Sequence, residues 1–120
     1  MGAWRVAARD ELRDTRVAVA ADGEEVVVFA VGDGLYAYAN RCPHAGGPVC
    51  RGRVMPGVAP ELDGEGAVVR QRFDDGDLRL VCPWHGWEFE LETGVCVSDR
   101  RRRLRSYEVE ERDDGVYVVA

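Results

Sequence analysis

Short apolar segments, separated by turn signals, run along the whole chain. Several of them alternate apolar and polar positions with a period of two, which is typical of a strand with one buried face. The segments are rich in valine, leucine, alanine or aromatic residues and cover 16–20, 24–31, 35–40, 68–73, 78–82, 87–90, 103–110 and 116–119. Short strands at this spacing predict an all-β fold, an antiparallel sandwich or barrel.

Asp-Gly dipeptides mark the expected turns between these segments. They occur at 22–23, 33–34, 63–64, 75–76 and 114–115, and Asp-Gly readily adopts the positive φ that tight hairpin turns require. Residues 51–66 are rich in glycine and proline, and this composition predicts a long surface loop. The only helix that the pattern predicts is one or two turns within the charged segment 8–15.

The length of the chain favours one compact unit. Its 120 residues fit a single domain spanning residues 1–120, because domains most often contain roughly 100 to 150 residues. The longest apolar run, residues 26–31, is far shorter than the ~20 residues that a membrane-spanning helix needs. Seven of the first sixteen residues are charged, so no secretory signal is predicted, and we expect a cytoplasmic protein with no membrane partner.

The charge of the chain is acidic overall but unevenly distributed. A formal net charge of −6 argues against a general nucleic-acid binder, because phosphate binding needs an excess of basic side chains. Five arginines nevertheless occupy 100–103 and 105, and the rest of the chain has 22 acidic residues and 11 arginines. This run is either a docking patch for an acidic partner or nucleic acid, or a solvated turn before a strand, and the turn is the preferred interpretation.

The two histidines each follow a cysteine closely. They occur in Cys42-Pro43-His44 and in Cys82-Pro83-Trp84-His85, and both segments continue into glycine-containing turns. Ordinary polar histidines beside turns would not be expected to repeat this pairing. Two loops that each supply one thiolate and one imidazole predict a metal site with four ligands.

The distribution of the ligands over the loops indicates which metal. Zinc sites with two cysteines and two histidines usually pair cysteine with cysteine and histidine with histidine along the chain. Here each loop is mixed, which suits a [2Fe-2S] cluster in which one iron takes both cysteines and the other takes both histidines. A zinc-binding structural or interaction module with the same four residues remains the alternative.

The two segments resemble the cluster-binding loops of Rieske [2Fe-2S] proteins, in particular the soluble ferredoxins of oxygenase systems. The similar stretches are residues 42–48, CPHAGGP, and residues 82–89, CPWHGWEF. The resemblance implies an antiparallel β base domain built from both ends of the chain and an inserted cluster-binding part at about 41–90. It also implies that the inner iron is bound by Cys42 and Cys82 and that the more exposed iron is bound by His44 and His85.

Two departures from the usual pattern of this family stand out. Between His44 and Cys82 lie 37 residues, more than in most such ferredoxins, so we expect an insertion at about 51–79 that affects partner docking. The loop cysteines that form a disulfide in respiratory Rieske proteins are replaced by Gly47 and Trp84. Hydroxyl groups near the cluster are also replaced, so the potential should lie at the low end of the roughly −150 to +300 mV Rieske range.

The predicted function is one-electron transfer without catalytic turnover. By resemblance, the chain would take electrons from a flavin or iron-sulfur reductase and pass them to an oxygenase or another redox enzyme. The alternative within the family is the small subunit of an assimilatory nitrite reductase, working with its large subunit. No nucleophile paired with a base is recognisable, and both histidines are used as ligands. The remaining cysteines, Cys50 and Cys96, are interpreted as inert buried thiols.

Overall fold

The computed structural model describes residues 2–43 and 46–120, and of these the side chains of 14, 58–61 and 69–75 are not described. About half of the described residues lie in β-strands. These strands form three antiparallel sheets of three strands each, which confirms the all-β prediction. Helical structure in this part of the chain is confined to α1 (Glu11–Asp14) and the 3-10 helix η1 (Val49–Arg51). None of its helices has the length and apolar character to cross a membrane.

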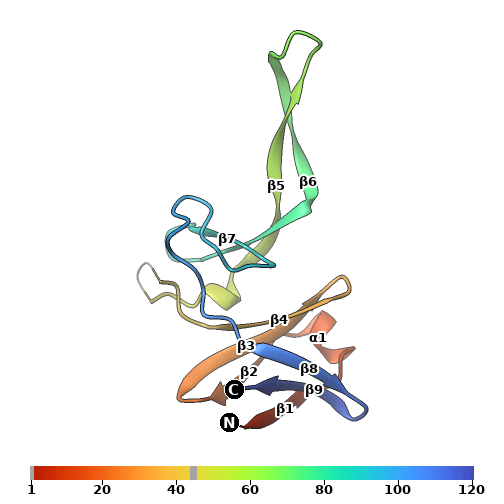
Figure 1. The fold of residues 1–120 in the computed structure, drawn as a ribbon, viewed down its shortest axis with the longest axis vertical. Helices are drawn as coiled ribbons and strands as arrows, with labels where there is room; N and C mark the ends of the chain where they lie inside the picture. The colour runs from red at the N-terminus through yellow and green to blue at the C-terminus, as the bar shows by residue number, and fades with distance from the viewer. Residues whose placement is uncertain (1, 44–45) are drawn as a thin grey trace.

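Two of the sheets form the base of the molecule, where both chain ends lie (Figure 1). The first has the order β1-β9-β8, and the second has the order β2-β3-β4. Gly2 and Ala120 exchange backbone hydrogen bonds of 2.6 and 3.0 Å, so the two ends are held side by side. The strands are β1 (Ala3–Ala7), β2 (Val17–Ala21), β3 (Glu24–Val31), β4 (Gly34–Ala39), β8 (Glu108–Arg112) and β9 (Gly115–Val119).

The third sheet contains β5 (Arg53–Leu62), β6 (Val68–Val81) and β7 (Glu88–Glu90) in that order. It lies on the other side of β3 and β4 from the first sheet (Figure 1). A buried hydrogen bond of 2.6 Å from the Tyr38 hydroxyl to the Leu91 carbonyl ties β4 to the chain after β7. The predicted cluster-binding loops therefore lie where the third sheet packs on the base, the first loop after β4 and the second after β6.

Strand β3 separates two hydrophobic cores, because its successive side chains point to opposite faces. Val26 and Val28 belong to the base core, whereas Val27 and Phe29 belong to the core beneath the third sheet. All four side chains are at most 3% exposed. The second core also contains Tyr38, Cys42, Val49, Cys50, Leu80, Cys82, Phe89, Leu91, Cys96 and Leu104. Every cysteine of the chain thus lies in this one core.

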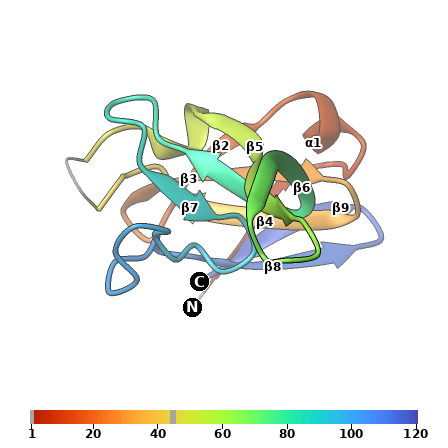
Figure 2. The same cartoon turned by 90° about the horizontal axis from the view of Figure 1, so that it is seen from above.

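The predicted surface loop at 51–66 is wrong, because most of it is strand β5, paired with β6. The β5–β6 hairpin projects from the body (Figure 1), and the molecule with its hairpin measures 55 × 32 × 21 Å along its principal axes. Figure 2 shows the hairpin nearly end-on above the body. Pro56 and Pro60 suggested a loop, but β5 is the edge strand of its sheet, where the missing proline N–H leaves no neighbour unpaired.

The prediction of turns at Asp-Gly is correct at 22–23 and wrong at 75–76. At 22–23 both residues have positive φ, 52° and 78°, and they connect β2 to β3. Residues 75–76 instead lie inside β6, where the pairing shifts between Pro56–Leu78 and Gly57–Asp74. The two segments predicted at 68–73 and 78–82 are therefore one irregular strand. Strand β1 was not predicted at all.

Candidate metal centre

The two predicted ligand loops have the same backbone construction. In the first loop, which follows β4, the Cys42 N–H donates to the Gly47 carbonyl and the Gly46 N–H donates to the Cys42 carbonyl, both at 2.8 Å. In both loops the N–H of the cysteine donates to the carbonyl of the residue five positions later, and the carbonyl of the cysteine accepts from the N–H of a glycine four positions later. In the second loop, after β6, the equivalent bonds are Cys82 to Trp87 at 2.8 Å and Gly86 to Cys82 at 3.0 Å.

A glycine with positive φ completes each turn. Gly46 has a φ of 76° and Gly86 has a φ of 72°, a conformation that side chains other than glycine rarely adopt. The two loops thus share the same backbone hydrogen bonds and a glycine with positive φ at the same distance from the cysteine.

The two cysteines meet beneath the loops. Cys42 and Cys82 are only 3% and 1% exposed, and their thiols interact directly. Burial raises the pKa of the Cys82 thiol, and the adjoining Cys42 raises it further, against a lowering by a hydrogen bond from the backbone of Trp84. Two buried thiols held together are stable as thiolates only beside a compensating positive charge, such as a metal ion.

The structure describes one of the two histidines. His85 is exposed at the tip of the second loop, whereas His44 lies outside the described residues. The structure thus brings Cys42, Cys82 and the loop carrying His85 together. Buried thiols with an exposed imidazole fit a [2Fe-2S] group bound by cysteine on its inner side and by histidine on its outer side. The assignment of all four ligands stays a prediction.

The loops touch through a glycine and a tryptophan. Gly47 is buried, and a Cβ atom built on it would lie 2.8 Å from Cδ2 of Trp84. Only glycine lets the first loop approach the tryptophan ring this closely. These are the positions where respiratory Rieske proteins would have the disulfide, and all four cysteines here are free. Ring packing therefore takes the place of a covalent link between the loops.

Arg102 contacts both loops, which the sequence did not predict. Its Nη1 donates to the Pro43 carbonyl at 3.2 Å, and its guanidinium carbon lies 5.6 Å from the centre of the Trp87 ring. Asp99 accepts from its Nε at 3.3 Å and holds the side chain in place. Arg102 is 59 positions from Pro43 along the chain, so only the folded structure reveals the contact.

We expect Arg102→Gln to lower the reduction potential and to speed the loss of iron to a chelator. The variant removes a positive charge beside the first loop, and that charge stabilises the more negative reduced state. Arg102→Lys should restore much of the potential but not the stacking on Trp87. Protein-film voltammetry and chelator kinetics measure the two effects separately.

Arg101→Gln is the matched control for this prediction. Arg101 also pairs with Asp99, at 3.2 Å, but its side chain is 91% exposed. We therefore expect a small change in potential and no change in iron release. Equal effects of the two substitutions on the potential and on iron release would show that the contacts of Arg102 with Pro43 and Trp87 do not stabilise the loops.

Cys50 and Cys96 have the surroundings of packing residues. Both are 0% exposed. Burial raises the pKa of the Cys50 thiol from its ordinary value of 9.0 to about 12, and its Sγ lies 3.5 Å from the Tyr38 carbonyl. Cys96 pairs with Phe89 through an isolated bridge. These contacts support the prediction that both thiols are inert.

The raised pKa of Cys50 predicts that stability falls at alkaline pH. The folded state favours the neutral thiol, so its contribution is complete below pH 9 and is lost as the pH rises towards 12. The free energy of unfolding should fall by roughly 1 kcal/mol per pH unit in that window because of this thiol. Urea unfolding at pH 8 and pH 10.5 should show a smaller decrease for Cys50→Ala. Equal decreases in the two proteins would contradict the prediction.

Comparison with known proteins places the chain in a family. A family model for the Rieske [2Fe-2S] domain matches residues 3–108. The ferredoxin of carbazole 1,9a-dioxygenase from Nocardioides aromaticivorans IC177 is 25% identical, with a TM-score of 0.66 over 98% of this chain and 97% of that one. A protein described as an NADH-dependent nitrite reductase small subunit from Mycobacterium tuberculosis is also 25% identical, with a TM-score of 0.72 over 99% and 96%.

Similarity also extends to part of a much longer protein. Cholesterol 7-desaturase nvd of Hemicentrotus pulcherrimus is 30% identical over 94 residues, which are 78% of this chain. The chain spans only 3% and 16% of the lengths of the two curated relatives that it matches. The family match implies a Rieske-type [2Fe-2S] cluster as cofactor, which favours the cluster over the zinc interpretation. The paired turns, the buried thiols and the match over residues 3–108 together show that this chain belongs to the Rieske [2Fe-2S] domain family.

Proposed function

We propose that this chain is a one-electron carrier whose cluster is held by Cys42, His44, Cys82 and His85. The observation that carries the proposal is the pair of equivalent turns that place two buried thiols against each other. When bound, a Rieske cluster supplies reversible uptake and release of one electron. The protein supplies the thiolates, the imidazoles and a surrounding that keeps water away.

The two sides of the site would have different tasks. Cys42 and Cys82 lie in the hydrophobic core with Leu80 and Phe89, which exclude water from the inner side. His85 is exposed and belongs to the outer side. A partner that approaches this side comes nearest to the cluster, so we place electron entry and exit at the tips of the loops.

The proposed partners are proteins rather than a small substrate. Both solved structures named above have nearly the same length as this chain, since the matches cover 97% and 96% of them. This similarity supports a separate carrier or a small subunit that receives electrons from a flavin or iron-sulfur reductase. The acceptor would be an oxygenase or another redox enzyme. Thiol ligands of this kind suit the reducing cytoplasm.

A second candidate role is the small subunit of a nitrite reductase. The structural similarity to the Mycobacterium tuberculosis protein, with its TM-score of 0.72, favours this role. The two roles differ in the partner, not in the chemistry of the site. A gene for a nitrite reductase large subunit beside the gene for this chain would support the subunit role, and an oxygenase gene there would support the carrier role.

Metal analysis and an electron titration test the proposal. Protein purified without oxygen should be red-brown, should contain about two irons and two acid-labile sulfides per chain, and should take up one electron per chain in a coulometric titration. A colourless protein with one zinc per chain would overturn it. A coloured protein that cannot be reduced and reoxidised would keep the cluster but contradict the carrier function.

A further inference from the structure

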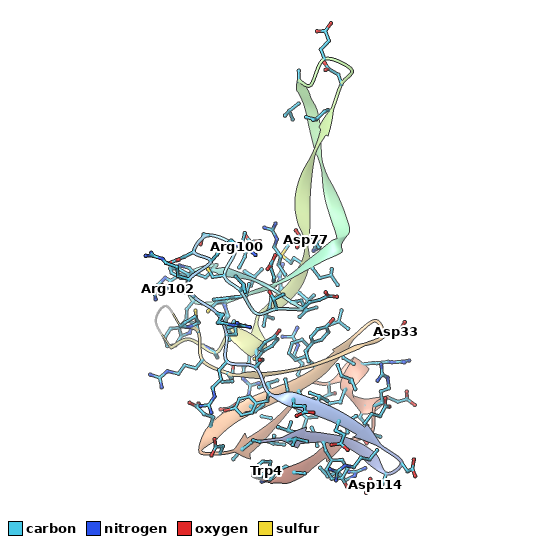
Figure 3. All side chains as sticks on the ribbon, in the orientation of Figure 1. Trp4, Asp33, Asp77, Arg100, Arg102 and Asp114 are labelled. Atoms are coloured by element: carbon cyan, nitrogen blue, oxygen red, sulfur yellow. The ribbon has the colours of Figure 1, made fainter. Side chains whose placement is uncertain are left out.

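Arginines gather beside the first ligand loop. We call Arg41, Arg100, Arg101, Arg102, Arg103 and Arg105 the basic rim. Figure 3 shows Arg100 and Arg102 on the same side of the molecule and away from Asp114. The side chains of Arg100, Arg101 and Arg105 are 65%, 91% and 58% exposed. These charges are therefore available to a molecule that approaches the loops.

The backbone brings the rim to the loop. The Ala39 N–H, at the end of β4, donates to the Arg105 carbonyl at 2.9 Å, only three residues before Cys42. Val95 and Arg103 form an isolated antiparallel bridge, which holds the run at a second point. The arginine run thus lies along the exit of β4. Residues 100 and 101 form an exposed turn ahead of β8, in agreement with the preferred interpretation of the run, and this turn lies close to the first ligand loop.

A cavity of about 330 Å³ opens between the rim and the first loop. Three arginines of the rim line it, together with the candidate ligand Cys42. Its lining is Glu24, Ala39, Arg41, Cys42, Pro43, Gly46, Arg103 and Arg105. The hollow is large enough for one or two carboxylate side chains, and it begins at a residue that we propose to bind the cluster.

The rim remains positive after its own ion pairs are considered. Asp99, Glu90 and Asp22 pair with rim arginines at 3.1 to 3.4 Å. In the described part of the chain, no ion pair to a carboxylate is formed by Arg41 or Arg103. Exposed pairs contribute only about 0–1 kcal/mol each, so an incoming carboxylate can replace them. The rim is thus a positive area on a chain with a net charge of −6.

We propose that the basic rim docks the redox partner by binding aspartate and glutamate side chains on that partner. The inference rests on the proposed function and adds the chemistry of the contact surface. A nucleic acid fits the rim poorly, because the remainder of the chain, with 22 acidic residues and 10 arginines, repels an extended polyanion. A compact acidic patch on a protein meets only the rim.

The rates at which small charged oxidants accept the electron report the sign of the electrostatic potential around the ligand loops. Reduced protein is mixed with ferricyanide or with hexaammineruthenium(III) at ionic strengths from about 0.1 to 1 M, where screening lengths fall from ~10 to ~3 Å. At these distances the probe senses local charge. We expect the ferricyanide rate to fall at least about threefold with added salt and the ruthenium rate to rise. A ferricyanide rate that rises with salt would overturn the proposal.

Charge-removal variants assign the effect to particular residues. Arg41→Gln combined with Arg103→Gln should remove most of the salt dependence seen with ferricyanide. Arg112→Gln removes the same kind of charge from the end of β8, where Arg112 pairs with Glu110 at 3.2 Å. It should leave the salt dependence unchanged. Equal effects in the two proteins would show that net charge, not the rim, governs the rate.

A probe that cannot be reduced here separates docking from electron transfer. Hexacyanochromate(III) is a paramagnetic trianion that broadens the NMR signals of nearby amides. Broadening at residues 100–105, absent in the Arg41/Arg103 double variant, would support the rim whether or not the proposed carrier function holds. Broadening elsewhere, or tighter binding of a 20-residue oligothymidylate than of a 20-residue polyglutamate at 0.15 M salt, would overturn the docking of acidic side chains.

Discussion

Cys42→Ser and Cys82→Ser are each expected to yield protein without iron. A neutral hydroxyl cannot replace a buried thiolate as a ligand without a large loss of affinity, and both side chains lie in the core with exposures of 3% and 1%. Iron analysis and the visible spectrum of anaerobically purified protein measure the loss. The far-ultraviolet circular dichroism of each variant reports whether the strands are retained.

The other two cysteines are the internal controls for this prediction. Cys50→Ala and Cys96→Ala remove thiols that are as deeply buried, at 0% exposure, and belong to the same core. Both variants should keep the iron content and the spectrum of the parent protein. Two irons and an unchanged spectrum in Cys42→Ser or Cys82→Ser would show that the ligand assignment is wrong.

Phe89→Ala should be the most destabilising of the simple core substitutions, by about 3 to 5 kcal/mol. Phe89 is fully buried, pairs with Leu80 across β6 and β7, and forms a bridge with Cys96. Its side chain packs in one core with Leu80 and Cys96, so Phe89 helps to hold the strand before the second ligand loop against the strand after it. Urea unfolding measures the loss of stability, and iron retention reports whether the two loops stay together.

Leu62→Ala and Phe89→Leu bracket the expected effect. Leu62 is 55% exposed near the end of the hairpin, so its truncation should change the free energy of unfolding by less than about 0.5 kcal/mol. Phe89→Leu keeps most of the apolar volume and should cost less than Phe89→Ala. A loss below about 1 kcal/mol for Phe89→Ala would show that the core around the loops is not tightly packed.

Local patterns predicted those parts of the fold that depend on local chemistry. The prediction for 24–31 coincides with β3, because its valine-rich run ends at turns on both sides. The hairpin was mispredicted because proline and glycine at 56 and 57 signal a loop, while the edge position that tolerates them follows only from the tertiary arrangement. Strand β1 has a charged residue, Arg5, at its centre and is defined by pairing with β9.

The same division applies to the candidate metal centre. The cysteine, histidine and glycine residues of each loop lie within seven consecutive positions, so their turns could be recognised from the sequence. The contact of Gly47 with Trp84 and the contact of Arg102 with Pro43 join segments that are far apart along the chain. No sequence period or motif encodes such contacts, so they could be recognised only in the folded structure.

The projecting hairpin also determines how the chain divides if it is cut. Its tip, around Asp63 and Glu65, is exposed and lies between Cys42 and Cys82 in the sequence. Cleavage there would leave two fragments, each with one of the ligand turns. Pairing of β5 with β6 and of β1 with β9 would still hold them together. Strand pairing, rather than the peptide connection through the hairpin, therefore keeps the two turns adjacent. The candidate metal centre lies between two parts of the chain that could associate as separate fragments.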